Sequence, residues 1–152
     1  MIVFFLDANV LFSAVYRPQS APGLLIDFAS AGLARAVTSA YALEEARRNL
    51  ALKAPDAIPA WERVRSSCAL CPSPSNETLK WSAAQIVAKD APILAAAVDA
   101  ECDWLVTGDR RDFGHLFGSN QRGVLVISPS EALRRLIRHR LSARPDRRLR
   151  CD

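Results

Sequence analysis

The chain has 152 residues, of which half are hydrophobic and 7% aromatic, and it carries a formal net charge of +4 at pH 7. This length suits one domain, and no apolar run approaches the roughly 20 residues that a membrane-spanning helix needs. Residues 134–152 hold eight Arg and two Asp, which leaves a net charge of about −2 for residues 1–133. The composition therefore gives no support for a protein whose whole surface binds nucleic acid.

Short apolar segments alternate with helical patterns along the chain. Strands are expected where β-branched and aromatic residues form short runs, and helices where apolar residues recur every three or four positions. The expected order is strand 2–6, helix 8–15, helix 21–31, strand 34–38, helix 40–54, helix 58–67, strand 69–72, helix 79–87, helix 91–100, strand 104–107, a loop at 110–118, strand 124–127 and helix 129–141.

This alternation is typical of an α/β protein with a parallel sheet, helices on both faces and right-handed crossovers. One domain is expected over residues 1–141, followed over 142–152 by a basic tail too charged to pack. The N-terminal run lacks the basic leader and cleavage site of a signal peptide, so we expect a cytoplasmic protein with reduced cysteines.

Acidic residues follow two of the expected strands and stand near the start of two helices. In chain order they are Asp7, Glu45, Asp90, Asp109 and Asp112. Because the carboxyl ends of parallel strands share one edge of the sheet, these acids can converge there. Carboxylates that share a dry site repel one another, and a hard divalent cation, Mg²⁺ or Mn²⁺, relieves that repulsion. The pattern favours metal-assisted hydrolysis of a phosphodiester.

Each of these acids also has a purely structural explanation. Asp90 can cap the helix that follows it, and Gly108-Asp109 can form a turn. Glu44 and Glu45 lie on a helix that also carries two arginines, which is typical of a solvated, salt-bridged face. The set as a whole is harder to explain in this way, because its members point to one edge of the sheet.

The sequence resembles the PIN-domain family, which includes the ribonuclease toxins of VapBC-type toxin–antitoxin pairs. The resemblance covers about residues 2–135 and rests on segments in a fixed order, namely Phe5-Leu-Asp-Ala-Asn-Val-Leu and residues 38–50, 90–97, 104–113 and 124–133. It implies a three-layer α/β/α sandwich around a mostly parallel sheet of four to five strands, and a nuclease site that uses Mg²⁺ or Mn²⁺.

The resemblance also implies roles for individual residues. The implied catalytic acids are Asp7, Glu45, Asp90 and Asp109, and the implied metal ligands are Asp7, Asp90, Asp109 and Asp112. Asn9 would orient Asp7 or a water, and Thr107 would place a hydroxyl near the metal. Lys89 and Arg110 flank the acids and would hold the RNA backbone.

The helix acid of the family can be matched to either of two adjacent glutamates. In the family it falls six positions after the Ser that closes the second strand, which selects Glu45 when counted from Ser39, with Glu44 as the alternative. Adjacent helical residues point about 100° apart, so both cannot serve equally. The family analogy further implies an RNA substrate, a small antitoxin protein as partner and a homodimer, with no membrane association.

Two other functions remain open on the sequence alone. A haloacid-dehalogenase-like phosphatase also begins with a hydrophobic strand that ends in Asp, but it needs a second acid two residues later, where this chain has Asn9. A PIN-like module that binds RNA or protein without cutting is the other alternative, and the intact set of acids argues against it.

Overall fold

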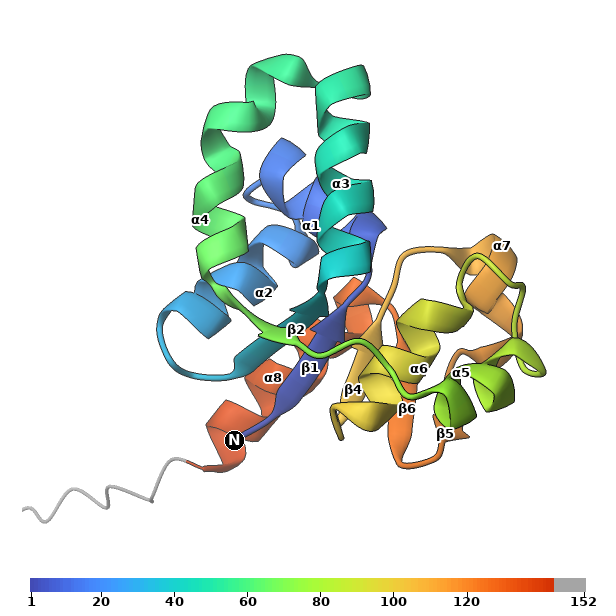
Figure 1. Ribbon diagram of the computed structural model, residues 1–152. Coiled ribbons are helices and arrows are strands. Elements are labelled where there is room, and N and C mark those ends of the chain that lie inside the picture. The colour runs from blue at the N-terminus through green and yellow to red at the C-terminus, as the bar shows by residue number, and fades with distance from the viewer. Residues whose placement is uncertain (144–152) are drawn as a thin grey trace, which may run out of the picture.

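The computed structural model describes residues 1–143, and they are organised around a six-stranded sheet (Figure 1). The strands are β1 (Val3–Leu6), β2 (Arg35–Ser39), β3 (Cys68–Cys71), β4 (Trp104–Val106), β5 (Asn120–Gln121) and β6 (Val124–Ile127). Their order across the sheet is β3-β2-β1-β4-β6-β5, and all neighbours are parallel except β5 and β6, which are antiparallel.

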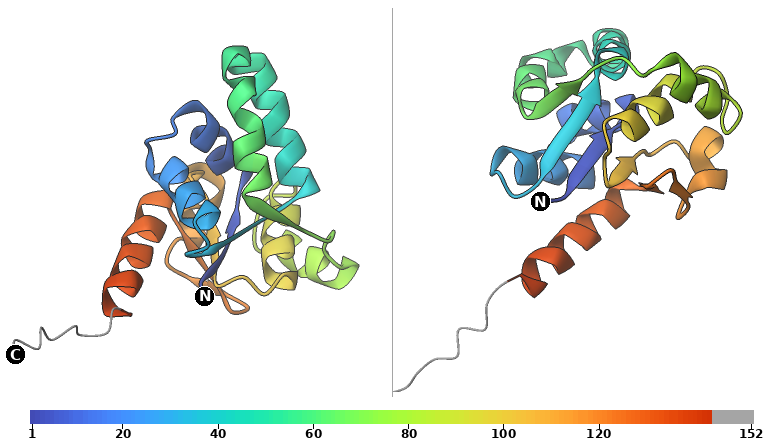
Figure 2. Two further views of the ribbon diagram at one scale, coloured as in Figure 1. Left: turned by 90° about the vertical axis from the view of Figure 1, so that its left-hand side faces the viewer. Right: turned by 60° about the horizontal axis from the view of Figure 1, so that its bottom comes forward.

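Helices cover both faces of this sheet, which gives three layers (Figures 1 and 2). The helices are α1 (Ala8–Tyr16), α2 (Ala21–Ser30), α3 (Ala40–Lys53), the 3₁₀ helix η1 (Pro55–Ala60), α4 (Trp61–Ser66), α5 (Asn76–Ala83), α6 (Ala91–Asp99), α7 (Arg110–Phe113), the 3₁₀ helix η2 (Gly114–Leu116) and α8 (Pro129–Ser142). Helices α1, α2 and α8 lie on one face, and α5 and α6 lie on the other. The predicted α/β/α class is confirmed.

Strand β1 lies at the centre of the sheet, between β2 and β4. Its residues Phe4, Phe5 and Leu6 are fully buried, as expected for a strand covered on both faces. The Phe4 ring stacks on Trp104 of β4 with 6.4 Å between the ring centres. Apolar packing on both sides therefore fixes the point at which β1 ends.

The strand order reverses beside β1. The chain proceeds from β1 through β2 to β3 on one side, then returns to β4 on the other side of β1, forms the edge strand β5 and comes back to place β6 between β4 and β5. In open α/β sheets, ligands bind in the crevice that such a reversal leaves at the carboxyl ends of the strands. The residues that follow β1 and β4 occupy that crevice.

Several helix starts agree with the sequence. Ser39 Oγ accepts a hydrogen bond from the Ala42 backbone N–H at 3.2 Å, and Ser128 Oγ accepts one from Glu131 at 3.2 Å. These bonds satisfy amide donors that a first helical turn leaves free. Helix α6 begins with Pro92 in its first turn and is buried along most of its length, as predicted.

The differences from the sequence lie at element ends, in one strand and at residues 110–118, where the expected loop holds α7 and η2. Strand β5 was not predicted, because its two residues become a strand only by pairing with β6. The helix expected at 79–87 begins earlier, at Asn76, where Ser75 caps it, and ends at Ala83. Helix α8 extends to Ser142, and the remainder of the predicted basic tail lies outside the described residues. Within residues 1–143, no helix is both long and apolar enough to cross a membrane.

Candidate metal centre

The buried strand β1 delivers Asp7 to the carboxyl edge of the sheet. The Asp7 backbone N–H donates to the Val106 carbonyl at 3.1 Å, which ties the end of β1 to the end of β4. Asp7 is also the N-cap of α1, and its Oδ1 accepts a hydrogen bond from the Ala8 N–H at 2.7 Å. Only 3% of Asp7 is exposed. A short turn therefore holds a carboxylate in a nearly dry position.

Two neighbouring side chains bind the second oxygen of this carboxylate. Thr107 Oγ1 donates to Asp7 Oδ2 at 2.7 Å, and Asn9 Nδ2 donates to the same oxygen at 2.9 Å. We call Asp7, Asn9 and Thr107 the Asp7 network. It extends to the next loop, because Asn9 Oδ1 accepts from the Gly108 N–H at 2.7 Å and Thr107 Oγ1 accepts from the Asp109 N–H at 3.1 Å. The network thus fixes Asp109 relative to Asp7.

Burial raises the pKa of Asp7 from 3.8 to about 6. The hydrogen bonds from Thr107 and Ala8 act in the opposite direction, while the negative charges of Asp90 and Glu45 raise the pKa further. The ionised form of Asp7 is thus costly in the absence of a nearby positive charge.

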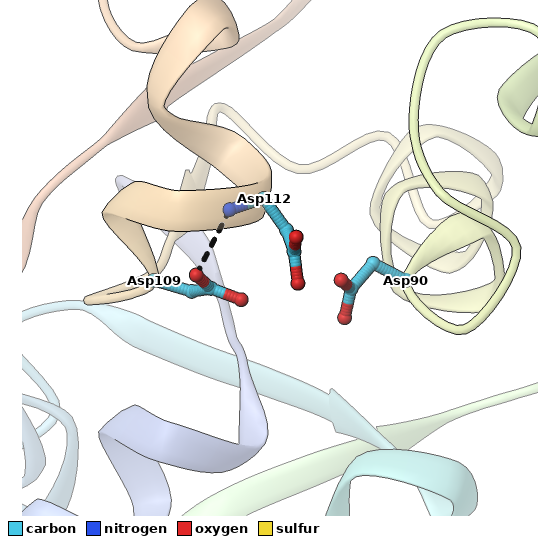
Figure 3. Close-up of side chains that lie close together, drawn as sticks. All are labelled: Asp90, Asp109 and Asp112. Carbon is cyan, nitrogen blue, oxygen red and sulfur yellow. Dashed lines mark hydrogen bonds between the residues drawn. The ribbon is translucent and has the colours of Figure 1, made fainter.

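Three aspartates come together beside the network: Asp90, Asp109 and Asp112, here called the aspartate trio (Figure 3). Each offers an oxygen, and these atoms all lie within 4.8 Å of one another. Asp109 caps α7, and its Oδ1 accepts a hydrogen bond from the Asp112 N–H at 3.0 Å. Two members of the trio are thus positioned by one short helix.

Asp90 differs from an ordinary helix cap. It occupies the N-cap position of α6, but its side chain makes no capping hydrogen bond. Its Oδ2 is buried and accepts no hydrogen bond from the described residues. Burial is the largest effect on Asp90 and raises its pKa. A buried carboxylate oxygen that accepts no hydrogen bond depends on a nearby cation to offset its charge.

Lys89 is the positive charge next to the trio. Its Nζ lies 2.8 Å from Asp112 Oδ2 and 3.1 Å from Asp90 Oδ2, where it attracts the carboxylate without the alignment of a hydrogen bond. The Lys89 side chain is 63% exposed. Its ammonium group lowers the pKa of Asp112.

A cleft of about 450 Å³ opens onto these acids. Its lining includes Asp7, Glu45, Asp90 and Asp109, which come from four different parts of the chain. Glu45 is half-buried and faces the cleft, whereas Glu44 is exposed and pairs with Arg47 at 3.7 Å. The phase of α3 therefore distinguishes the two glutamates.

The donor set suits a hard divalent cation. The trio supplies only carboxylate oxygens, which Mg²⁺ and Mn²⁺ prefer, and one of its buried oxygens accepts no hydrogen bond within residues 1–143. Asp7 and Glu45 line the same cleft but lie outside the trio. Asp7 as a direct metal ligand therefore stays a prediction.

The other residues predicted from the sequence differ in whether they contact the acids. Asn9 and Thr107 contact Asp7, and Lys89 contacts the trio, whereas the Arg110 guanidinium lies 5.9 Å from the centre of the Phe117 ring. Contact between Arg110 and substrate therefore stays a prediction.

Three residues of α3 near the site were not predicted from the sequence. They are Asn49 and Lys53, which line the cleft, and Tyr41, whose hydroxyl donates to the Lys89 carbonyl at 2.7 Å. All three stand a multiple of four residues from Glu45, a spacing that could have identified them.

Comparison with known proteins gives one family and several similar structures. The model of the PIN domain family matches residues 3–111. A structure of PAE2754 from Pyrobaculum aerophilum is 19% identical and aligns with a TM-score of 0.64 over 90% of this chain and 98% of that one. VapBC2 from Rickettsia felis, bound to a promoter DNA fragment, is 13% identical, with a TM-score of 0.63 over 84% of this chain and 98% of that one.

A third structure, FitAB bound to the IR36 DNA fragment, is 23% identical and has a TM-score of 0.51 over 83% of this chain and 94% of that one. A comparison with curated protein sequences gives no match. At these identities the similar structures show only the fold. The match to the family model is the evidence that assigns the chain to a family.

Proposed function

The chain belongs to the PIN-domain family, and from that premise we propose that it is a ribonuclease that depends on Mg²⁺ or Mn²⁺. The observation that carries this proposal is the aspartate trio at the cleft, with a buried Asp90 oxygen that accepts no hydrogen bond from the described residues. Asp7 and Glu45 line the cleft together with Asp90 and Asp109, and Asp112 lies beside the last two, so four carboxylates line one space and a fifth adjoins it. Such a concentration of negative charge is suited to a divalent cation and a phosphodiester substrate.

We assign different roles in this reaction to different residues of the chain. A divalent ion, when bound, would lower the pKa of a water and stabilise negative charge on phosphate oxygens. Asp90, Asp109 and Asp112 would hold it. The Asp7 network fixes a further carboxylate at the floor of the cleft. Glu45 faces the cleft from α3 and is the residue we assign to orient the attacking water and accept its proton.

Lys89 has a second role in this proposal. Its ammonium group is mostly exposed and borders the cleft as well as the trio. When a cation neutralises the trio, Lys89 becomes available to bind a non-bridging phosphate oxygen of the RNA. Lysine binds phosphate as a point charge and needs no fixed orientation.

We further propose that the protein is the toxin of a toxin–antitoxin pair that acts in the cytoplasm. Two of the similar structures, VapBC2 and FitAB, are described as complexes with DNA, and their fold supports a small protein partner here. A homodimer remains a prediction from the family resemblance.

The phosphatase alternative is weaker than it was on the sequence alone. Asn9 occupies the position where that family needs an acid, and its amide donates to Asp7 instead of offering a second carboxylate. A non-catalytic module is disfavoured because the acids around the cleft are complete.

Cleavage of a labelled single-stranded RNA by the purified protein tests the proposal. We expect cleavage with Mn²⁺ or Mg²⁺, none in EDTA, recovery when the metal is restored, and loss in Asp109→Asn, whose Oδ1 can still accept the Asp112 N–H. Cleavage that persists in EDTA and in this variant would contradict it. A beryllium fluoride adduct on Asp7 would support a phosphatase instead.

A further inference from the structure

We propose that helix α3 provides a path for single-stranded RNA past the acids, with Lys53 binding a backbone phosphate at one end and the Tyr41 ring stacking on a base at the other. This inference rests on the proposed nuclease function and adds the residues that bind the substrate on either side of the bond to be cut. Helix α3 stands above the carboxyl edge of the sheet beside α1 (Figure 1).

One face of α3 is turned to the cleft. Glu45, Asn49 and Lys53 all line it, and their spacing of four residues places them on one stripe of the helix. At 1.5 Å per residue, the helix carries Lys53 about 12 Å along its axis from Glu45. The stripe thus leads from the acids to a cation, with a neutral amide between them.

Within residues 1–143, Lys53 is the lysine of the cleft lining that forms no ion pair. The cleft is lined by two lysines, and the other, Lys89, is engaged by Asp90 and Asp112. Among the ion pairs formed within residues 1–143, none involves Lys53, whose side chain is exposed at the last turn of α3. An unpaired ammonium group beside a cleft of carboxylates is suited to a phosphate at a distance from those carboxylates.

Tyr41 lies one turn before Glu45, near the start of α3 and outside the cleft lining. It is 45% exposed although it is aromatic, and its hydroxyl is bound to the Lys89 carbonyl at 2.7 Å. This bond holds the ring next to the residue that contacts the trio. A ring that is both exposed and fixed offers a base a stacking surface at little cost in conformational entropy.

These two positions favour a single strand over a duplex. Stacking on Tyr41 needs a base whose face is free, and bases inside a helix are covered by their neighbours. A backbone that reaches from Tyr41 to Lys53 passes Glu45, which brings a phosphate between the two contacts to the acids.

Binding of a fluorescein-labelled, unstructured RNA 10-mer by fluorescence anisotropy tests this inference. The measurement uses Asp109→Asn protein in Mg²⁺, so that the RNA is not cut, and compares further substitutions in that background. We expect Tyr41→Leu to weaken binding about 5-fold to 100-fold, the range for one stacked base, and Tyr41→Phe to retain most of it. We expect Lys53→Met to reduce the slope of log K against log salt by about 0.7, the value for one single-strand phosphate.

Lys80→Met is the matched control for Lys53→Met. Lys80 is an exposed lysine on α5 that lies outside the cleft lining, so its loss removes the same charge without changing the path. We expect its slope to match that of the parent protein. The same 10-mer annealed to its complement should bind more weakly than the single strand, and Tyr41→Leu should not change the duplex affinity.

The outcomes separate this inference from the proposed function. If the wild-type protein cleaves RNA but Tyr41→Leu and Lys53→Met bind the single strand as the parent does, the path along α3 is wrong and the nuclease stands. Equal effects of Lys53→Met and Lys80→Met would likewise overturn the assignment of Lys53. If the wild-type protein neither binds nor cleaves RNA, the proposed function fails and this inference fails with it.

Discussion

Asp7 and Asp112 both lie at the carboxyl edge of the sheet, and their surroundings shift their pKa values in opposite directions. Asp7 is surrounded by neutral donors and apolar residues, and burial raises its pKa to about 6. Asp112, at the surface side of the aspartate trio, is paired with the Lys89 ammonium, which lowers its pKa. Hydrogen bonds hold the Asp7 carboxylate, whereas the Asp112 carboxylate forms an ion pair with the exposed Lys89.

This difference separates a fixed part of the site from an adaptable part. Asp7 cannot move without breaking bonds to both strand ends, because Thr107 and Asn9 also bind the loop that carries Asp109. Lys89, by contrast, reaches the trio with a flexible, exposed side chain. We therefore expect changes in the Asp7 network to be more damaging than changes at Lys89.

The largest effect is expected for Asp7→Asn, which removes the charge from the fixed part. Outer partners of a metal site typically contribute 10-fold to 100-fold, so loss of a carboxylate at the site itself should lower RNA cleavage by more than about 100-fold. The rate of cleavage with Mn²⁺ at saturating RNA is the measurement. A rate within a few-fold of wild type would remove Asp7 from the mechanism.

The same substitution should change how stability depends on pH. Because folding raises the pKa of Asp7, the folded state keeps a proton between pH 3.8 and about 6 that the unfolded state has released. The stability due to Asp7 is therefore present below pH 3.8 and is lost as the pH rises to about 6, by up to about 3 kcal/mol.

Urea unfolding in EDTA at pH 4 and pH 7.5 measures this effect. Asp7→Asn should gain stability relative to wild type on going from pH 4 to pH 7.5. An unchanged difference between the two proteins would mean that Asp7 ionises freely in the folded state.

The next effect is expected for Thr107→Val, which removes the hydroxyl between Asp7 and Asp109 and keeps the shape of the side chain. The hydroxyl donates to one acid and accepts from the backbone of the other, so cleavage should fall about 10-fold to 100-fold. Thr107→Ser, which keeps the hydroxyl, is the control and should retain most activity. Equal activity of both variants would show that the bond does not position the acids.

Matched substitutions of two adjacent glutamates on α3 test the contribution of Glu45, which we expect to be smaller than that of the Asp7 network. Glu45→Gln should lower cleavage about 10-fold or more, because it removes a base that faces the cleft. Glu44→Gln removes the same charge from the exposed neighbouring position and should leave cleavage unchanged within about twofold, since surface changes rarely exceed 0.5 kcal/mol. The reverse ranking would mean that the helix acid had been assigned to the wrong glutamate.

The smallest effect is expected for Lys89→Met, at the adaptable part. Without the ammonium group the trio should bind Mn²⁺ a few-fold more tightly, because no cation competes for its oxygens, and metal-free stability should fall by less than about 1 kcal/mol. Calorimetric titration with Mn²⁺ measures the affinity, and Lys89→Arg, which keeps the charge, is the control. A weaker affinity in Lys89→Met would show that Lys89 helps to assemble the trio.

The fixed part of the site was largely predictable from the sequence. Asp7 and Asp109 each end a buried strand, and the pattern of apolar runs locates both ends. Parallel strands end at one edge, so these two acids had to lie near each other. The choice of Glu45 over Glu44 agrees with the phase of α3.

The members of the adaptable part were named from the sequence, but the contacts that organise them join distant segments and were not predictable. The resemblance implied Asp90 as a metal ligand, with a helix cap as its structural alternative, and the structure leaves its side chain without a capping bond. The bond from Tyr41 to the Lys89 carbonyl joins residues 48 positions apart and has no local signal. Strand β5 was missed for the same reason, since it exists only through its partner β6.

The central claim is that the aspartate trio holds a divalent metal. Electron paramagnetic resonance of free Mn²⁺, titrated with wild-type protein and with Asp109→Asn, tests it directly. We predict that the wild-type protein removes the signal of free Mn²⁺ with one or two ions bound per chain, and that Asp109→Asn, folded as judged by circular dichroism, binds at least about 10-fold more weakly. Equal binding by the two proteins, or no binding by wild type at millimolar Mn²⁺, would contradict the claim.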